Sequence, residues 1–167
     1  MKRLAIIILF AAAMTACREV PVVEVETGRT DTLQERNATA NRYLSQGEES
    51  QISAYIERRG WQMQRLTGGT RVMETRRGTG GRIDYEDTVV VEYDLAALNG
   101  AVIYNGVIDT VVAGHLEPTR GLDAALRTLS RDSEAVVIVP SGQAYGVVGD
   151  GDRVPTRAIL VYKLKVK

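Results

Sequence analysis

An alternating stretch from Thr88 to Leu98 constrains the fold of this chain more than any other feature of its sequence. Apolar side chains recur there at every second position, and acidic side chains fall between them at Glu92 and Asp94. A period of two is that of a β-strand with one buried face. Asn99-Gly100 follows at once and strongly favours a tight hairpin turn, which returns the chain through residues 101–104. The stretch therefore predicts an antiparallel sheet that turns one face toward a core.

Two later runs, residues 135–139 and 158–162, are rich in β-branched residues and bounded by Gly and Pro, which predicts two more strands. The segment between them carries Gly, Pro and Asp at the density of a loop. It also holds Tyr145 and Val154, apolar groups that a merely solvated loop has little use for. Long loops with apolar side chains of their own are often functional, so this loop is the first candidate for a site.

A short amphipathic helix is predicted between these two groups of strands. Its apolar side chains have the i, i+3, i+4, i+7 spacing of one helical face: Leu122, Ala125, Leu126 and Leu129. Further short strands are expected at 61–66 and 71–76, joined by a turn at Gly68-Gly69. One helix among antiparallel strands covers one face of the sheet. The predicted class is therefore α+β, with an antiparallel sheet wrapped around one short helix.

Residues 32–60 are expected to form an N-terminal helical extension of two helices. Each begins at a candidate capping box, one at Thr32 with Glu35 and the other at Ser45 with Glu48. The second helix has its bases late and Gly60 just past its end, as the helix dipole and C-cap favour. Packing against the following domain is the leading interpretation; a dimer contact and a client-binding arm are the alternatives.

The chain begins with a segment typical of a targeting signal. Lys2 and Arg3 precede an apolar stretch, residues 4–13, that is too short to span a bilayer. Met14-Thr15-Ala16-Cys17 follows, contains the only cysteine, and resembles a bacterial lipobox. We therefore predict a lipoprotein signal peptide over 1–16, lipidation of Cys17 and a tether over 17–31. The expected location is the bacterial cell envelope, on the periplasmic side of the outer membrane; an ordinary secretory signal is the alternative.

The charge composition of the chain limits the classes of molecule that it is expected to bind. The formal net charge is zero with both signs interspersed, which argues against nucleic acid. His115 is expected at the surface. Asp150 and Asp152 alternate with glycines but lack the run of ligands and the closing glutamate of a calcium loop, so turn chemistry accounts for them better.

An ordered set of short motifs occupies the second half of the chain: Val90-Val91-Glu92-Tyr93, Asn99-Gly100, Arg120-Gly121-Leu122-Asp123, Val139-Pro140, Ala144-Tyr145-Gly146, Val154-Pro155 and Ala158-Ile159-Leu160-Val161-Tyr162. With these motifs, Thr88 to Lys165 resembles an FKBP-type peptidyl-prolyl cis-trans isomerase domain, and a weaker match over Trp61–Asp87 extends the predicted domain to 61–167. The lipid anchor, the helical pair and the variant Gly121-Leu122-Asp123-Ala124-Ala125-Leu126 further resemble the FKBP-like lipoproteins associated with gliding motility.

The resemblance implies an envelope foldase that isomerises X–Pro bonds in proline-containing polypeptide clients and needs no cofactor or metal. The implied catalytic residues are Tyr145, Tyr93 and Tyr162, and the implied substrate-binding residues are Ile103, Tyr104, Pro118, Thr119, Leu122 and Val154. Tyr93 and Tyr162 lie on predicted strands and Leu122 lies on the apolar stripe of the predicted helix. All three can therefore also be ordinary core residues.

Three of these positions depart from the family pattern. The family usually has an aromatic at Ile103, a carboxylate at Tyr104 and a tryptophan at Leu122, and whether Asp109 supplies the carboxylate is left open. These departures predict weak isomerase activity. The alternative is a non-catalytic peptide-binding chaperone or assembly lipoprotein on the same scaffold.

Overall fold

The computed structural model describes residues 28–167, with side chains from residue 32. The predicted signal peptide, Cys17 and most of the predicted tether lie outside the described residues. The chain divides into two compact units, 1–37 and 38–167, and all contacts described below lie within the second.

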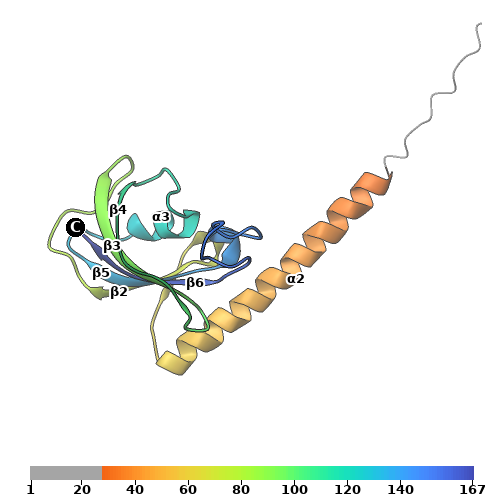
Figure 1. The fold of residues 1–167 in the computed structure, drawn as a ribbon, viewed down its shortest axis with the longest axis horizontal. Coiled ribbons are helices and arrows are strands. Elements are labelled where there is room, and N and C mark those ends of the chain that lie inside the picture. Colours follow the sequence, from red (N-terminus) through yellow and green to blue (C-terminus); the bar gives the residue numbers. More distant parts are fainter. Residues whose placement is uncertain (1–27) are drawn as a thin grey trace, which may run out of the picture. The chain divides into compact units, whose positions relative to one another are not determined.

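The second unit is built on one six-stranded antiparallel sheet with the strand order β1-β2-β5-β6-β3-β4 (Figure 1). The strands are β1 (Gln64–Arg65), β2 (Arg71–Arg76), β3 (Thr88–Ala97), β4 (Val102–Val112), β5 (Glu134–Val139) and β6 (Leu160–Val166). Two short 3-10 turns complete the elements, η1 (Thr67–Gly69) and η2 (Ser141–Gln143). Of the strand predicted over 61–66 only β1 forms, while the turn at Gly68-Gly69 is present.

Strand β3 has the predicted faces, because Val89, Val91, Tyr93 and Leu95 are buried and the residues between them are more exposed. The Asn99-Gly100 hairpin is also confirmed: the Asn99 side chain accepts a hydrogen bond from the Ala101 amide. Strand β4, however, continues to Val112, well beyond residue 104, with register shifts opposite the Tyr93–Ala96 segment of β3. β4 is thus the longest strand of the sheet.

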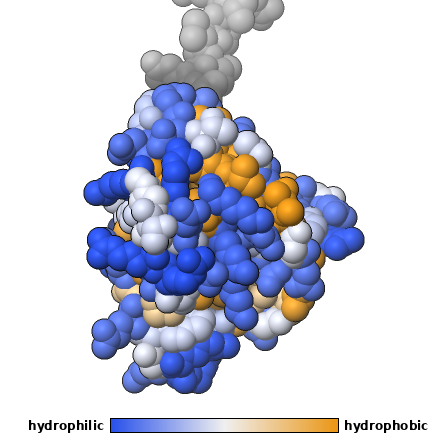
Figure 2. Space-filling view, turned by 90° about the vertical axis from the view of Figure 1, so that its left-hand side faces the viewer, coloured by the Kyte–Doolittle hydropathy of each residue, from blue (hydrophilic) through white to orange (hydrophobic). Residues whose placement is uncertain are grey.

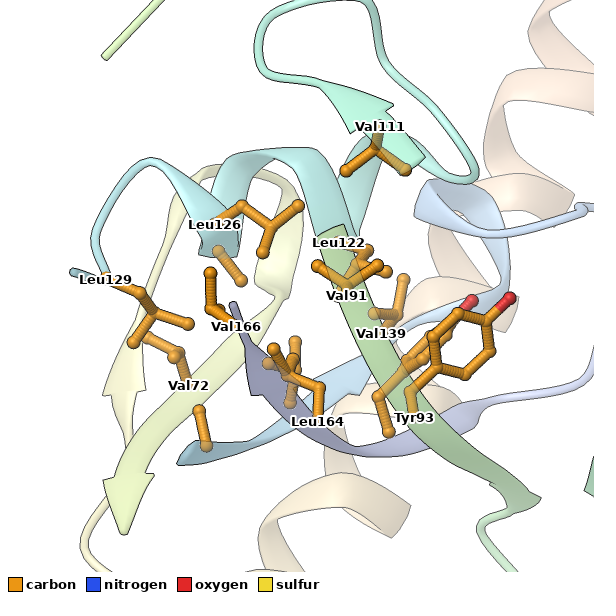
Figure 3. Packing of buried hydrophobic residues seen from close by; sticks show 14 of the residues in the cluster. Val72, Val91, Tyr93, Val111, Leu122, Leu126, Leu129, Val139, Leu164 and Val166 are labelled. Carbon is orange, nitrogen blue, oxygen red and sulfur yellow. The ribbon is translucent and has the colours of Figure 1, made fainter. Parts of the chain in front are cut away.

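Helix α3 (Arg120–Leu126) lies across the concave face of the sheet and closes the main core (Figures 1 and 3). Thr119 caps its start by accepting a hydrogen bond from the Leu122 amide at 3.2 Å. The buried side of α3 presents Leu122, Ala125 and Leu126 to the sheet, as the predicted stripe requires. The predicted α+β class, with a sheet around one short helix, is confirmed.

The N-terminal extension is one continuous helix, α2 (Gly28–Arg59), so the prediction of two helices is wrong. The helix continues through the second candidate capping box, where the Ser50 hydroxyl donates to the Gln46 carbonyl one turn earlier. A capping box fits a helix start but does not forbid a helix already under way, because Ser, Gln and Glu are also tolerated in helix interiors.

Only the last turns of α2 are buried on the sheet. Residues 32–47 are exposed, whereas Ile52 is fully buried and Tyr55 nearly so. They form a second, smaller core on the convex face of the sheet, together with Val136, Ile138, Ile159 and Val161. Arg59 stacks on Tyr55, 3.5 Å from the ring centre, and Trp61 packs edge-on against the same ring.

The face shown in Figure 2 is largely hydrophilic, with a smaller hydrophobic patch. None of the helices in the described part of the chain has the length and apolar character needed to cross a membrane.

Candidate functional site around the Tyr145 loop

Two tyrosines on neighbouring strands form the centre of the candidate site. Tyr93 of β3 and Tyr162 of β6 meet edge to face, with ring centres 5.4 Å apart and ring planes at 66°. Tyr162 is fully buried and Tyr93 is 8% exposed. In Figure 3 the Tyr93 hydroxyl points away from the aliphatic side chains of Leu164 and Val166. The two tyrosines therefore extend from the core toward one end of the sheet, where their hydroxyl groups lie.

Burial raises the pKa values of the site tyrosines. It raises the pKa of Tyr93 to about 12, with smaller contributions from Tyr145 and the Asp109 carboxylate. It also raises the pKa of Tyr162 and, to a smaller extent, that of Tyr145, where Asp150 and Asp109 act in the same direction. A tyrosine hydroxyl with an ordinary pKa of about 10 is already neutral at physiological pH, so the raised pKa values extend to higher pH the range in which all three can donate hydrogen bonds.

The Tyr162 hydroxyl is buried and has no hydrogen-bond partner of regular geometry among the described residues. The Tyr145 and Thr119 side chains lie close enough to affect its pKa. Both act on it as hydrogen-bonding neighbours, so the Tyr162, Tyr145 and Thr119 side chains form one polar group within the apolar core.

The loop that carries Tyr145 is held at three points. Within the loop, the Gly146 amide donates to the Ser141 carbonyl at 2.9 Å, with Gly146 at a φ of 63° that favours glycine. From the end of the loop, the Arg157 amide donates to the Gly146 carbonyl at 2.8 Å. From α2, the Glu48 carboxylate accepts hydrogen bonds from both the amide and the hydroxyl of Ser141.

The outer part of the same loop is tied to β4 by Tyr104. Its hydroxyl donates to the Asp150 carboxylate at 2.8 Å, and this bond raises the pKa of Tyr104 to about 12. Asp150 also accepts from the amides of Asp152 and Val154, the turn chemistry expected for this acidic segment. Although burial alone would raise it, these hydrogen bonds hold the pKa of Asp150 below its usual value.

The structure brings most of the predicted site residues into one neighbourhood. Tyr93, Tyr162, Ile103, Leu122 and Val154 are buried in the main core, and Tyr104 and Tyr145 pack against it half-buried. Thr119 is buried beneath Tyr162, and Pro118 precedes it, half-buried. Leu122 and Tyr162 are fully covered, so a peptide touches them only after side chains at the rim move apart.

A family model for the FKBP-type peptidyl-prolyl cis-trans isomerase matches residues 80–167. The chain belongs to this family. A probable FKBP-type 25 kDa peptidyl-prolyl cis-trans isomerase of Pseudomonas aeruginosa is 32% identical over 138 residues, covering 79% of this chain and 57% of that protein. The chain thus spans little more than half the length of that relative.

Solved structures share the fold at lower identity. A peptidyl-prolyl isomerase from Pseudomonas syringae pv. tomato superposes with a TM-score of 0.62 at 21% identity, covering 75% of this chain and 92% of that one. The N-terminal domain of FKBP42 from Arabidopsis thaliana gives 0.58 at 21% identity, covering 64% and 90%. AtFKBP13 gives 0.57 at 18% identity, covering 63% and 96%.

Within this FKBP-type domain, the three departures from the family pattern have distinct surroundings. Leu122 is fully buried in the core and Ile103 is 8% exposed at its margin. Tyr104 points its hydroxyl at Asp150 and has the Arg153 guanidinium 5.3 Å from its ring centre. Tyr104 therefore serves as a strut for the loop where the family usually has a carboxylate.

Sequence reasoning missed two groups near the site and left a third open. Glu48 and Ser141, which join α2 to the loop, are 93 residues apart and carry no local signal of their contact. Asp109 lies on β4 opposite Val91, half-buried, and acts on Tyr93 and Tyr145. A carboxylate thus does face the FKBP tyrosines, from a strand whose length the sequence did not predict.

Proposed function

We propose that this FKBP-type chain is a peptidyl-prolyl cis-trans isomerase of low activity that acts on proline-containing polypeptides in the bacterial envelope. The observation that carries the proposal is the grouping of three neutral tyrosine hydroxyls at the margin of one apolar core, with those of Tyr145 and Tyr162 close enough to interact. The relative from Pseudomonas aeruginosa, which is named a probable peptidyl-prolyl cis-trans isomerase, supports this class of reaction.

The reaction asks little of the protein beyond such a surface. Rotation about an X–Pro bond crosses a barrier of ~18–20 kcal/mol because the amide loses its resonance. The twisted amide is less polar than the planar one, so an apolar, water-poor contact favours the twisted form. Tyr145 is the proposed donor to a substrate carbonyl, and the apolar contact comes from Ile103, Val154 and the ring of Tyr93.

Low activity follows from the same contacts. Aliphatic side chains stand at Leu122 and Ile103, where the family usually has aromatic ones, and aromatic groups offer more contact area to a prolyl ring. Leu122 is also fully covered. We expect an Ile103→Phe variant to gain several-fold in kcat/KM, since each 1.36 kcal/mol of transition-state stabilisation is about tenfold.

The test is prolyl isomerisation of an X–Pro peptide followed by magnetisation exchange or a coupled assay. Replacing Tyr145 by Phe removes one neutral hydrogen bond to substrate and should lower kcat/KM by about three- to tenfold. Tyr43→Phe is the matched control, because Tyr43 is 77% exposed on α2. An unchanged rate in the Tyr145→Phe protein would remove Tyr145 from the mechanism.

A second candidate function, a peptide-binding chaperone or assembly factor without turnover, is favoured by the closed state of the core, in which Leu122 and Tyr162 have no exposed surface. Suppression of client aggregation by the Tyr145→Phe protein, with its isomerase rate reduced, would show that binding is separable from turnover. Loss of both together would favour a single isomerase site.

The membrane anchor is part of the same proposal and is supported by the lipobox-like Met14-Thr15-Ala16-Cys17. Two or more acyl chains at Cys17 would hold the protein stably on the membrane, since each buried CH₂ contributes ~0.8 kcal/mol. Labelled palmitate should be incorporated into the wild-type protein in bacterial cells and not into a Cys17→Ala variant. Equal labelling of the two would overturn the anchor.

A further inference from the structure

We propose that the hollow between α2 and the Tyr145 loop is an extension of the peptide site and binds acidic residues that flank the client's proline. The inference rests on the proposed function, because it assumes a proline-containing client. The hollow itself is a feature of the structure and does not depend on that assumption. It has a volume of about 950 Å³ and is open to solvent. One wall is α2 from Ala38 to Ser50, and the other contains the residues that begin and end the loop.

The hollow is continuous with the candidate site along the chain. Gly146, the residue after Tyr145, lies in its wall together with Val147, which is 62% exposed. The wall of the hollow thus begins one residue after the proposed hydrogen-bond donor of the site.

The charges in the hollow are not balanced. Its lining contains the arginines Arg42, Arg65 and Arg157 and the glutamates Glu48 and Glu49. Both glutamates are already engaged: Glu48 accepts two hydrogen bonds from Ser141, and Glu49 is paired with Arg71 and Arg65.

Arg42 and Arg157 differ from the other charged groups of the hollow. Both are exposed, and within residues 32–167 neither makes an ion pair. They stand on the two walls, Arg42 on α2 and Arg157 at the end of the loop. Two unpaired guanidinium groups in a hollow suit carboxylates, which they bind in bidentate fashion.

The apolar residues of the lining favour an extended polypeptide as the ligand over a small free anion. Leu44 on α2 and Val147 on the loop are 38% and 62% exposed, so both offer apolar contact in the hollow that the arginines line. A polypeptide with alternating acidic and small apolar residues matches this arrangement of side chains.

The wall is also fixed in place. The Glu48–Ser141 hydrogen bonds join α2 to the base of the loop, and the Arg157 amide bonds to Gly146 across the loop. Arg157 has a φ of 56°, a left-handed conformation uncommon for a residue with a side chain. The two arginines are thus mounted on segments that the Glu48 side chain joins to each other.

The experiment uses the full chain and two X–Pro peptides with the same reactive core. One carries an extension of alternating Glu and Ala, the other an extension of alternating Lys and Ala. We expect the wild-type protein to prefer the acidic peptide by about three- to tenfold in kcat/KM, and the preference to shrink as salt is added. The double variant Arg42→Gln, Arg157→Gln should lose the preference, and Arg42→Glu, Arg157→Glu should reverse it.

Arg58→Glu is the matched control, because Arg58 is exposed on α2 but does not line the hollow. Binding of a labelled acidic extension without proline, measured by fluorescence anisotropy, separates this inference from the proposed function. Selective binding without isomerisation would overturn the isomerase and support the hollow. Isomerisation without any charge preference, or an equal effect of Arg58→Glu, would overturn the hollow and leave the isomerase standing.

Discussion

The apolar side chains on the two faces of the sheet have different structural roles. On the concave face, β3 and β6 pack against α3 in a core that also holds the predicted site residues. On the convex face, the last turns of α2 cover only part of β5 and β6 with a small cluster around Ile52 and Tyr55. The concave core thus defines the domain, and the convex one attaches an extension to it.

The burial of the strands reflects this difference. In β3 buried and more exposed residues alternate, because only its concave side is covered. In β5 the five residues from Ala135 to Val139 are all buried, because α2 covers the side that α3 does not. A strand that is apolar on both faces therefore indicates where an extra layer lies.

The largest expected effect tests this division with one substitution on each face. Leu122→Ala should lower the free energy of unfolding of the whole domain by about 3–5 kcal/mol, the cost of a cavity in a closed core. Ile52→Ala should cost about 2–3 kcal/mol, mostly as undocking of α2. Urea unfolding gives the totals, and amide exchange should rise in residues 52–59 before it rises in β3.

Leu44→Ala is the control for this pair, because Leu44 lies on the same helix but is 38% exposed. It should change stability by less than about 0.5 kcal/mol. Equal acceleration of exchange in α2 and β3 by Ile52→Ala would show that the two faces unfold as one unit.

A smaller effect concerns only the concave face and appears at high pH. The raised pKa of Tyr93, about 12, means that the unfolded chain loses this proton near pH 10 and the folded chain later. Stability is therefore complete below pH 10 and falls as the pH rises from about 10 to 12, by about 1–2 kcal/mol for this partly covered hydroxyl.

Tyr93→Phe should make that decline less steep without abolishing it, because the raised pKa values of Tyr162, Tyr145 and Tyr104 also contribute to it. Urea midpoints measured at several alkaline pH values give the change. Tyr85→Phe, at a side chain that is 65% exposed, should leave the decline as it is in the wild type. A decline of the same steepness in all three proteins would show that Tyr93 does not cause it.

The smallest expected effect tests the hydrogen bonds that connect α2, on the convex face, to the Tyr145 loop. Glu48→Ala removes both acceptors of Ser141 and should speed amide exchange at Ser141 and Gly146 by about five- to tenfold, in line with one or two half-exposed hydrogen bonds. Global stability should change by no more than about 1 kcal/mol. Glu57→Ala, an exposed change on the same helix, should leave the loop amides unaffected.

The parts of the fold that were predictable from sequence are those fixed by local pattern. The period of two over Thr88–Leu98, the Asn99-Gly100 turn and the apolar stripe of α3 each carry their own evidence. The number of helices in the extension was mispredicted, because Ser45 and Glu48 suit a helix start and a helix interior alike. The full length of β4 was also missed, since residues 105–112 do not alternate clearly and register shifts separate them from the hairpin at Asn99-Gly100.

The candidate site was predictable as a set of residues and not as a shape. The resemblance identified Tyr93, Tyr145 and Tyr162, and the structure brings them together. Their burial, the strut from Tyr104 to Asp150 and the position of Asp109 depend on pairing between distant strands, which no local pattern specifies. The roles of these residues in catalysis remain predictions for the assays above.

The hydrogen bonds between Glu48 and Ser141 have a consequence for inheritance. They connect two segments 93 residues apart, one in the extension and one at the base of the loop. A recombination event that replaced the helix but kept the domain would leave Ser141 without its acceptor, even if every residue of the family motif survived. The extension and the loop should accordingly be exchanged between relatives as a matched pair.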